Sequence, residues 1–368
     1  MTEILVIGAG VVGASVAYRL ARAGAAVTIL DAGTVAGGTS SATYAWTNAN
    51  NKPPRAYHDL NVGGMRAHAA LREEFGDAPW LHGGGSLEWA TDEAHRAELR
   101  RRIERLCAWE YAAEEISARR FIELEPDVDP AVVADATIAY FPEEGWIDPV
   151  VYAHALIQAA ARAGGRLRTG SRVRALRRDG DRVVGVTTAD GRAHGADVVV
   201  NCAGRWASEV AAAAGLDIPL APTAGLLALT PPVPARVQHL LRAPECHLRP
   251  DGAGRLVIAS HEVDDALTVE TQPGPSAAAS VELVARAARL LPSIAGVRPE
   301  AVRLGIRPIP ADGYSAVGPF PGVAGYYLVV THSAVTLAPH LGALVADEII
   351  RGRQDVRLAP FRPARFLA

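Results

Sequence analysis

The sequence has few of the residues that form cross-links and metal sites. Its 368 residues include three cysteines, Cys107, Cys202 and Cys246, which lie far apart without a CxxC or CxxH spacing. This pattern does not favour a zinc site or a disulfide framework. We therefore expect no bound metal and a reducing, cytoplasmic location.

Long apolar runs and blocks of one charge are also missing. No apolar run reaches the roughly 18 residues that a membrane span needs, and the first buried strand begins too early to leave room for a signal peptide. The formal net charge is -3, without a basic cluster. We expect neither a membrane span nor a nucleic-acid partner.

The chain does have ample material for a core. Hydrophobic residues make up 49% of it and charged residues 21%, which favours a folded protein over a disordered one. A chain of 368 residues suits two domains, or one interleaved pair.

An uninterrupted series of recognisable elements fills the first 31 residues. The apolar run 4–7 predicts a buried strand, the glycine turn 8–13 leads into a helix that Gly24 ends, and residues 27–30 predict a second strand that ends at Asp31. Such a series predicts a dinucleotide site, with a plain glycine-rich turn as the alternative. The dinucleotide site fits better, because strand, turn, helix, strand and acid follow one another in register.

Each glycine of this turn has its own task in such a site. Gly8 permits the turn, Gly10 lets a pyrophosphate approach the backbone, and Gly13 lets the helix pack closely on the strand. The free amides at the helix start face the diphosphate. Asp31 accepts hydrogen bonds from a ribose diol and repels a 2′-phosphate, which disfavours NADP.

Two segments follow whose role the residues alone leave open. The small and hydroxylated residues Gly38, Thr39 and Ser40 suit a second contact to the pyrophosphate, or else form a flexible loop. Residues 44–51 are rich in aromatic and amide side chains, which either line a pocket or form a hydrogen-bonded loop.

The rest of the chain mixes helical and strand patterns. We predict helices at 59–75, 92–109, 145–163 and 277–291 and strands at 86–90, 172–177, 183–188, 196–201 and 325–330. The final helix is expected to start near Thr336, with Pro339 in its first turn. Residues 332–335 then form a loop at the carboxyl end of a strand, where doubly wound sheets bind ligands. The polar-turned strands after residue 171 form a meander, which a simple NAD domain does not need and which favours a flavoprotein.

Together these motifs resemble the FAD-dependent amine and amino-acid oxidoreductases of the D-amino-acid oxidase, glycine oxidase and sarcosine oxidase family. The resemblance extends over nearly the whole chain and is carried by the first 31 residues, 38–40, 145–149, 202–206, 305–308 and 331–332. It implies a set of residues around the cofactor: Gly8, Ala9, Gly10, Val12, Gly13, Asp31, Ala32, Gly38, Thr39, Ser40, Val173, Ala203, Gly204, Trp206, Arg307, His332, Ser333, Ala334, Val335 and Thr336.

The sequence departs from the family pattern at three places. No cysteine lies around Arg307 and no histidine follows soon after the Gly-Thr-Ser turn, so FAD is expected to be noncovalent. An arginine that holds the carboxylate in sarcosine oxidases would fall near Asn48, and a lysine that assists oxygen would fall near Val257. Their absence weakens a sarcosine assignment and leaves oxidase and dehydrogenase both open.

The expected fold is α/β, with a Rossmann-like FAD-binding domain that carries an inserted three-stranded meander. This domain is interleaved with a second, α+β substrate domain built on a mostly antiparallel sheet. The predicted FAD-binding domain comprises residues 1–80, 145–218 and 311–368, and the predicted substrate domain comprises residues 81–144 and 219–310.

The expected reaction is oxidative deamination of an amino acid or related amine. A hydride passes from the carbon beside nitrogen to flavin N5, and water hydrolyses the resulting imine. Arg307 is the candidate for the substrate carboxylate, with an interdomain salt bridge as its alternative. His332 and His261 are the other catalytic candidates, and Trp46, Asn48, Tyr140 and Tyr314 are expected to line the pocket.

Other functions compete with this hypothesis. The protein is expected to be a monomer or homo-oligomer, but a secondary or cyclic amine dehydrogenase that acts as the flavin subunit of a hetero-oligomer is the nearest alternative. An NAD-dependent dehydrogenase and a noncatalytic FAD-binding protein are the others.

Overall fold

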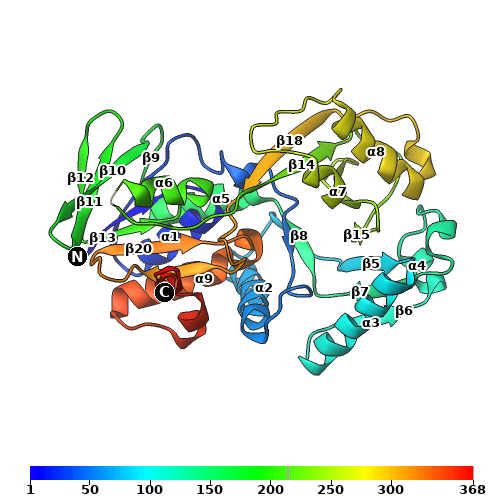
Figure 1. Cartoon of the computed structure of the whole chain (residues 1–368), viewed down its shortest axis with the longest axis horizontal. Coiled ribbons are helices and arrows are strands. Elements are labelled where there is room, and N and C mark those ends of the chain that lie inside the picture. Colours follow the sequence, from blue (N-terminus) through cyan, green and yellow to red (C-terminus); the bar gives the residue numbers. More distant parts are fainter. Residues whose placement is uncertain (214, 368) are drawn as a thin grey trace.

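Two bodies lie side by side along the long axis of the molecule (Figure 1). The computed structural model describes residues 1–213 and 215–367. One body is built on a six-stranded sheet and holds both chain ends, and the other is built on an eight-stranded sheet. None of the helices in the described residues is both long and apolar enough to cross a membrane.

The six-stranded sheet has the strand order β19-β20-β13-β1-β2-β9. All neighbours in it pair in parallel except β19, which is antiparallel to β20. Its strands are β1 (Glu3–Ile7), β2 (Ala26–Leu30), β9 (Arg166–Arg168), β13 (Val198–Asn201), β19 (Ala316–Pro319) and β20 (Tyr326–Val330). The parallel arrangement confirms the Rossmann-like fold expected from the first 31 residues.

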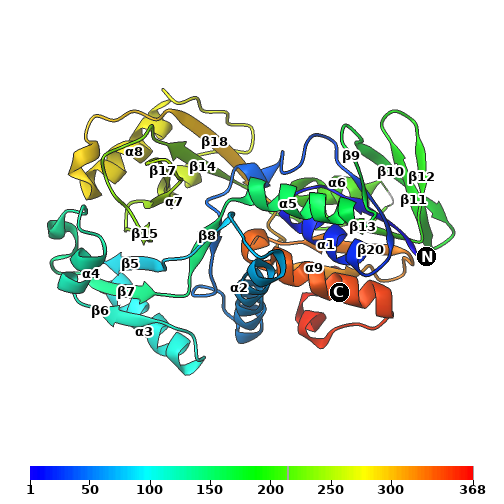
Figure 2. The ribbon, with the colours of Figure 1, turned by 180° about the vertical axis from the view of Figure 1, so that it is seen from behind.

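Side chains alternate between the two faces of this sheet, so β1 contributes to two separate cores. Ile4 and Val6 pack under the helices α1 (Val11–Arg22), α5 (Pro149–Arg162) and α9 (Ala334–Arg351). Figure 2 shows these helices side by side, and α1 packs against both of the others. Leu5 and Ile7 face the opposite core, under the meander and α6 (Ala207–Ala212). Because both faces are covered, the strand is continuously apolar.

The meander is present and antiparallel. It consists of β10 (Val173–Asp179), β11 (Arg182–Thr188) and β12 (Ala193–Gly195). Two of these strands match predicted ones, whereas β12 and the edge strand β9 have no predicted counterpart. Each spans three residues, too few for a period-2 pattern to be visible in the sequence.

The second body contains the eight-stranded sheet, in the order β18-β14-β17-β16-β15-β5-β7-β6. The sheet is antiparallel apart from the β15 and β5 pair, as expected. Its strands are β5 (Ser86–Ala90), β6 (Glu114–Ile116), β7 (Thr137–Phe141), β14 (Thr223–Leu229), β15 (Leu240–Arg242), β16 (His247–Pro250), β17 (Leu256–Ala259) and β18 (Ala301–Arg307), and its helices are α3 (Glu93–Ala108), α4 (Ala118–Leu124), α7 (His261–Asp265) and α8 (Ala278–Leu290).

A small sheet and the helix α2 (Arg55–Phe75) lie between the two bodies (Figure 1). The small sheet has the order β3-β8-β4, with β3 (Trp46–Thr47), β8 (Gly145–Ile147) and β4 (Leu81–His82). The prediction of a helix from Gly145 is wrong. Residues 145–147 pair with β3 and β4, and α5 starts only at Pro149, where the Asp148 carboxylate accepts hydrogen bonds from the first amides.

The domain boundaries stay a prediction. The strands of the two large sheets fall on the sides that those boundaries assign, but the small sheet takes β4 from one side and its other two strands from the other.

Helix α9 departs from its prediction at its start. It begins at Ala334 rather than Thr336, so residues 334 and 335 are helical and Pro339 lies beyond the first turn. A proline there has no N–H for the carbonyl four residues earlier, that of Val335. The imidazole Nε2 of His68, on α2, donates to this carbonyl at 2.9 Å instead. Burial lowers the pKa of His68 to about 4, so the ring is neutral.

We expect His68→Leu to destabilise the protein by roughly 1–3 kcal/mol, because it leaves the buried Val335 carbonyl without a donor. Pro339→Ala supplies a backbone N–H to the same carbonyl, so the loss should be smaller in the Pro339→Ala background. A double-mutant cycle in urea measures the coupling. An equal loss in both backgrounds would show that His68 acts in some other way.

The same histidine predicts a pH dependence. Because the pKa of His68 is lowered from 6.5 to about 4, the unfolded chain takes up the proton first as the pH falls. The contribution of neutral His68 to the free energy of unfolding is therefore complete above pH 6.5 and decreases toward pH 4. His68→Leu should lose less stability than the unmodified protein over this range.

Candidate active site

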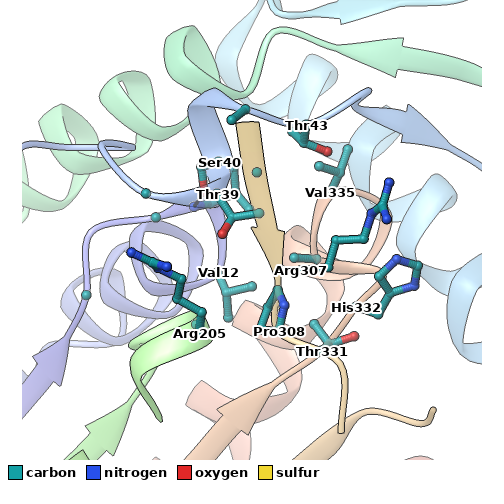
Figure 3. Close-up of a pocket in the computed structure, with 18 of the residues that line it drawn as sticks. Val12, Thr39, Ser40, Thr43, Arg205, Arg307, Pro308, Thr331, His332 and Val335 are labelled. Carbon is teal, nitrogen blue, oxygen red and sulfur yellow. Dashed lines mark hydrogen bonds between the residues drawn. The ribbon is translucent and has the colours of Figure 1, made fainter. Parts of the chain in front are cut away.

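One continuous cavity of about 1240 Å³ runs from the carboxyl end of the parallel sheet to the second body. The glycine turn and Asp31 line one end, and Arg307, His332 and His261 line the other. Figure 3 shows Arg307 and His332 next to each other, on the opposite side of the pocket from Arg205. Two regions far apart in the sequence thus share one space.

The glycine turn makes close backbone contacts beneath the cavity. Gly8 has φ +99°, and a Cβ there would lie 2.6 Å from the carbonyl oxygen of Cys202. A Cβ on Gly13 would overlap the carbonyl oxygen of Gly8. Gly10 differs, because its missing side chain faces the cavity, where the nearest atom is Ser40 Oγ at 3.0 Å. A ligand can therefore approach the backbone at Gly10.

Hydrogen bonds fix the groups around this turn. The Asp31 carboxylate accepts from the amides of Ala9 at 2.7 Å and Gly33 at 2.8 Å. Helix α1 has no side-chain N-cap at Gly10, and Ser40 Oγ accepts from the amide of Val11 at 3.2 Å. This combination of a helix N-terminus whose N-cap residue is a glycine and an acid after β2 fits the diphosphate and ribose of a dinucleotide.

The loop 38–40 connects this cradle to the second body. The Thr39 hydroxyl donates to the carbonyl of Ile306 at 2.6 Å, one residue before Arg307. A Cβ on Gly38 would lie 3.1 Å from the ring of Trp206, which lines the cavity. The loop is therefore packed and hydrogen-bonded, in keeping with a ligand contact.

The N-terminus of α9 opens on the middle of the cavity. Ser333 precedes the helix without a side-chain capping bond, and its hydroxyl pairs with Tyr57 at 2.8 Å. Its amide donates to Thr331 Oγ1 at 3.2 Å. The first amides of α9 and the positive end of its dipole are thus directed to the ligand space.

Arg307, at the end of β18, is held by the second body. It forms an ion pair with the buried Asp264 of α7 and donates to the carbonyl of Ala224 at 2.8 Å. Gly225 leaves room for the guanidinium, which a Cβ there would overlap. The alternative role predicted for Arg307 was an interdomain salt bridge. Its ion pair with Asp264 lies within one body instead, because β18 and α7 both belong to the second body.

Two histidines stand beside Arg307. Burial, together with the charges of Lys52, Arg307 and His261, lowers the pKa of His332 to about 4. Burial and the charges of Arg242 and Arg307 also lower the pKa of His261. Both rings are therefore neutral near pH 7 and able to accept a hydrogen bond.

A buried network forms the wall on the β3 side. Glu144 accepts hydrogen bonds from Trp46 Nε1 at 2.9 Å and Tyr111 at 2.6 Å, and burial raises its pKa to about 7. Trp46 and Asn48 both line the cavity. The Oδ1 of Asn48 is buried without a partner among the described residues, which leaves an acceptor for a ligand.

Not every candidate lies at the cavity. Ala9 and Gly13 support the turn from behind it rather than lining it. Tyr140 and Tyr314 do not line it either: the Tyr140 hydroxyl donates to the carbonyl of Gly84 at 3.3 Å, and the Tyr314 ring packs against Tyr57. All the other predicted cofactor, catalytic and pocket residues line the cavity.

Five cations in the cavity wall were not among the candidates: Lys52, Arg172, Arg174, Arg205 and Arg242. Lys52 had a signal in the composition, because it is the single lysine among the 37 lysines and arginines of the chain. Arg242 lies 4.5 Å over the Trp46 ring and forms an ion pair with Glu88 at 2.7 Å. Nothing in its sequence neighbourhood distinguishes it from the other arginines.

Comparison with known proteins identifies the family. The family model described as DAO, FAD dependent oxidoreductase, matches residues 3–348. The chain belongs to this family. It is therefore an FAD-dependent oxidoreductase that acts on amines or amino acids, as the motifs predicted.

Two relatives and one solved structure show how far the similarity extends. The chain is 28% identical to a glycine oxidase of Geobacillus kaustophilus over 99% of this chain and 97% of that one. It is 25% identical to an opine oxidase subunit of Rhizobium meliloti over 99% and 97% of the two chains. The crystal structure of glycine oxidase from Geobacillus kaustophilus superposes with a TM-score of 0.86, at 28% identity and 98% coverage of both chains.

The two glycines of the turn should respond differently to substitution. Gly10→Ala places a methyl group where the diphosphate approaches, so we expect FAD affinity to fall at least tenfold with little change in the melting temperature of the apoprotein. Gly13→Ala forces α1 away from β1 and should lower that melting temperature by several degrees. FAD titration and thermal melts of the apoproteins measure both. Equal effects on both quantities would contradict the division of roles.

Proposed function

We propose that the protein oxidises the carbon beside the nitrogen of a small amino acid or related amino-acid amine, with noncovalent FAD. The proposal rests on one observation, that a single cavity joins the nucleotide cradle to Arg307 and two neutral histidines. Bound FAD supplies the hydride acceptor, and the resulting imine is hydrolysed by water. The only cysteine in the described cavity wall, Cys202, lies under the glycine turn with its pKa raised by burial, which supports noncovalent binding.

Arg307 binds the substrate carboxylate in this proposal. A guanidinium has five N–H donors in a planar fork, and within the described residues Arg307 uses donors for Asp264, Ala224 and Thr223. The remaining donors are left for a ligand, because Arg307 lines the cavity. Asp264 orients the guanidinium, and its own second oxygen accepts from the amide of Leu226 at 2.8 Å, so the acid is fixed on both sides.

His332 and His261 orient the substrate nitrogen in this proposal. An amino acid arrives mostly as its ammonium form, and the nitrogen lone pair must be free before the neighbouring carbon is oxidised. The burial and positive charges that lower the pKa of His332 and His261 also favour the neutral form of the substrate amine, and each neutral imidazole can accept a hydrogen bond from it. The N-terminus of α9 stabilises the negative charge that develops in the centre of the cavity.

A second candidate is a dehydrogenase that works as one part of a larger assembly. It is favoured by the names of two relatives, which are subunits of an opine oxidase and of a hydrogen cyanide synthase. Both candidates share the reaction above and differ in the electron acceptor.

We expect the purified protein to carry FAD and its absorbance near 450 nm to be bleached anaerobically by one group among glycine, D- and L-amino acids and N-methyl amino acids. Readmitted air then separates the two candidates, since an oxidase recovers its colour at once and a partner-dependent dehydrogenase needs a dye. A yellow protein that no amine or amino acid bleaches would contradict the proposed function.

Arg307→Lys should raise the Kd for carboxylate-bearing substrates in anaerobic flavin reduction by about 10- to 100-fold, because a lysine cannot form the bidentate pair. The limiting rate of reduction should change much less. Arg303→Lys, at an exposed position of the same strand, is the matched control. An unchanged Kd in Arg307→Lys would exclude this arginine as the carboxylate anchor.

A further inference from the structure

The single lysine of the chain lies at the substrate end of the cavity. Lys52 follows β3, lines the cavity and is half-buried. Among the described residues it has no hydrogen bond and no ion pair. Every other basic position of lysine or arginine type in the chain is an arginine. A lone, unpaired ammonium in a ligand cavity needs an explanation that a surface lysine does not.

Positive charge is in excess at this end of the cavity. The cations that line it are Lys52, Arg242 and Arg307, whereas the acid that lines it within the described residues is Asp264, which pairs with Arg307. Glu88 is paired with Arg242 at 2.7 Å and also with the buried Arg102. The negative charges of this region are therefore already bound, and none is left for Lys52.

The nearest acid behind the wall does not neutralise Lys52 either. Burial and the charge of Arg242 lower the pKa of Lys52 to about 8; the charge of Glu144 opposes this shift only in part, and the two residues do not form an ion pair. Glu144 is instead surrounded by donors from Trp46, Asn50, Ser86 and Tyr111. Glu144 is therefore satisfied without Lys52, which lines the cavity with no partner among the described residues.

Lys52 and Arg307 act on the same part of the cavity. Lys52, Arg307 and His332 line the same cavity, and the charges of Lys52 and Arg307 both lower the pKa of His332. Arg307 is already assigned to one carboxylate. A second anionic group on the same small molecule would meet Lys52.

We propose that the substrate is an amino acid with a second carboxylate, on its nitrogen substituent or its side chain, and that Lys52 binds this second carboxylate. The inference rests on the proposed function, which supplies the first carboxylate and Arg307. Lysine suits the position because a compact ammonium on a flexible stem binds one carboxylate oxygen without the planar geometry that arginine imposes.

The test uses matched ligand pairs on the FAD-loaded protein. Sarcosine and iminodiacetate differ by one carboxylate, and so do the unreactive thioethers (methylthio)acetate and thiodiglycolate. Binding of the thioethers is followed by flavin difference spectra and by the shift in melting temperature. We expect the dicarboxylate of each pair to bind at least tenfold more tightly. D- and L-aspartate, compared with D- and L-alanine, distinguish a side-chain carboxylate from one on nitrogen.

Variants of Lys52 show whether this residue is the cause. Lys52→Met should reduce the preference for thiodiglycolate to less than threefold, and Lys52→Arg should retain most of it. Lys52→Gln replaces Lys52→Met if the latter fails to hold FAD, and Arg303→Lys is the unrelated control. FAD content and the visible spectrum report the integrity of each variant.

The outcomes separate the two proposals. No dicarboxylate preference in the unmodified protein, or a preference that survives in Lys52→Met, overturns the inference. A variant that changes only the rate of reaction with oxygen overturns it as well. If thiodiglycolate is preferred through Lys52 while no amine reduces FAD, the proposed reaction is wrong and the dicarboxylate site stands.

Discussion

The close approach of three backbone segments at the glycine turn determines how the rest of the molecule is arranged. Gly13 brings α1 against the carbonyl of Gly8, and Gly8 in turn lies against the carbonyl of Cys202 at the end of β13. No side chain larger than a hydrogen atom fits at either contact. The turn is therefore packed tightly at the carboxyl edge of the sheet, where it lines the cavity that reaches the second body.

The second body completes the cavity with charged residues that are themselves held by buried partners. Asp264 orients Arg307, and Glu88 balances Arg242 and Arg102. Such pairs need both partners, because a buried charge left alone is strongly destabilising. Lys52 differs from this pattern, because it lines the cavity without a partner among the described residues.

Much of the fold and most of the cofactor site were predictable from local sequence. Residues 4–31 carry apolar runs, glycines and an acid in an order that few other structures produce, and the meander follows from polar turns between alternating strands. The three-residue strands β9 and β12 were not predictable, because too few residues show a period. Residues 145–147 were wrongly predicted as the start of α5, although Pro149 marks the true start of that helix. They form the strand β8 only by pairing with β3 and β4, which are distant in the sequence.

Side chains in the site were harder to predict where tertiary packing decides. Tyr140 and Tyr314 are aromatic like Trp46, but only Trp46 lines the cavity. The fold shows that Tyr140 donates to the carbonyl of Gly84 and that Tyr314 packs against Tyr57. Pro339 was wrongly predicted to lie in the first turn of α9. Deeper in the helix it leaves the Val335 carbonyl without a backbone donor, and the hydrogen bond that replaces this donor comes from His68 on another helix. Lys52 was visible in the composition, but motif-based reasoning does not weigh the rarity of a residue type.

The central claim is that one cavity holds FAD at the glycine turn and the substrate carboxylate at Arg307. A crystal structure of the FAD-loaded protein with a bound carboxylate ligand tests it most directly. The account predicts the diphosphate against Gly10 and the first amides of α1, and the ligand carboxylate on Arg307 beside His332. A carboxylate bound elsewhere, with Arg307 still facing only Asp264, would contradict it.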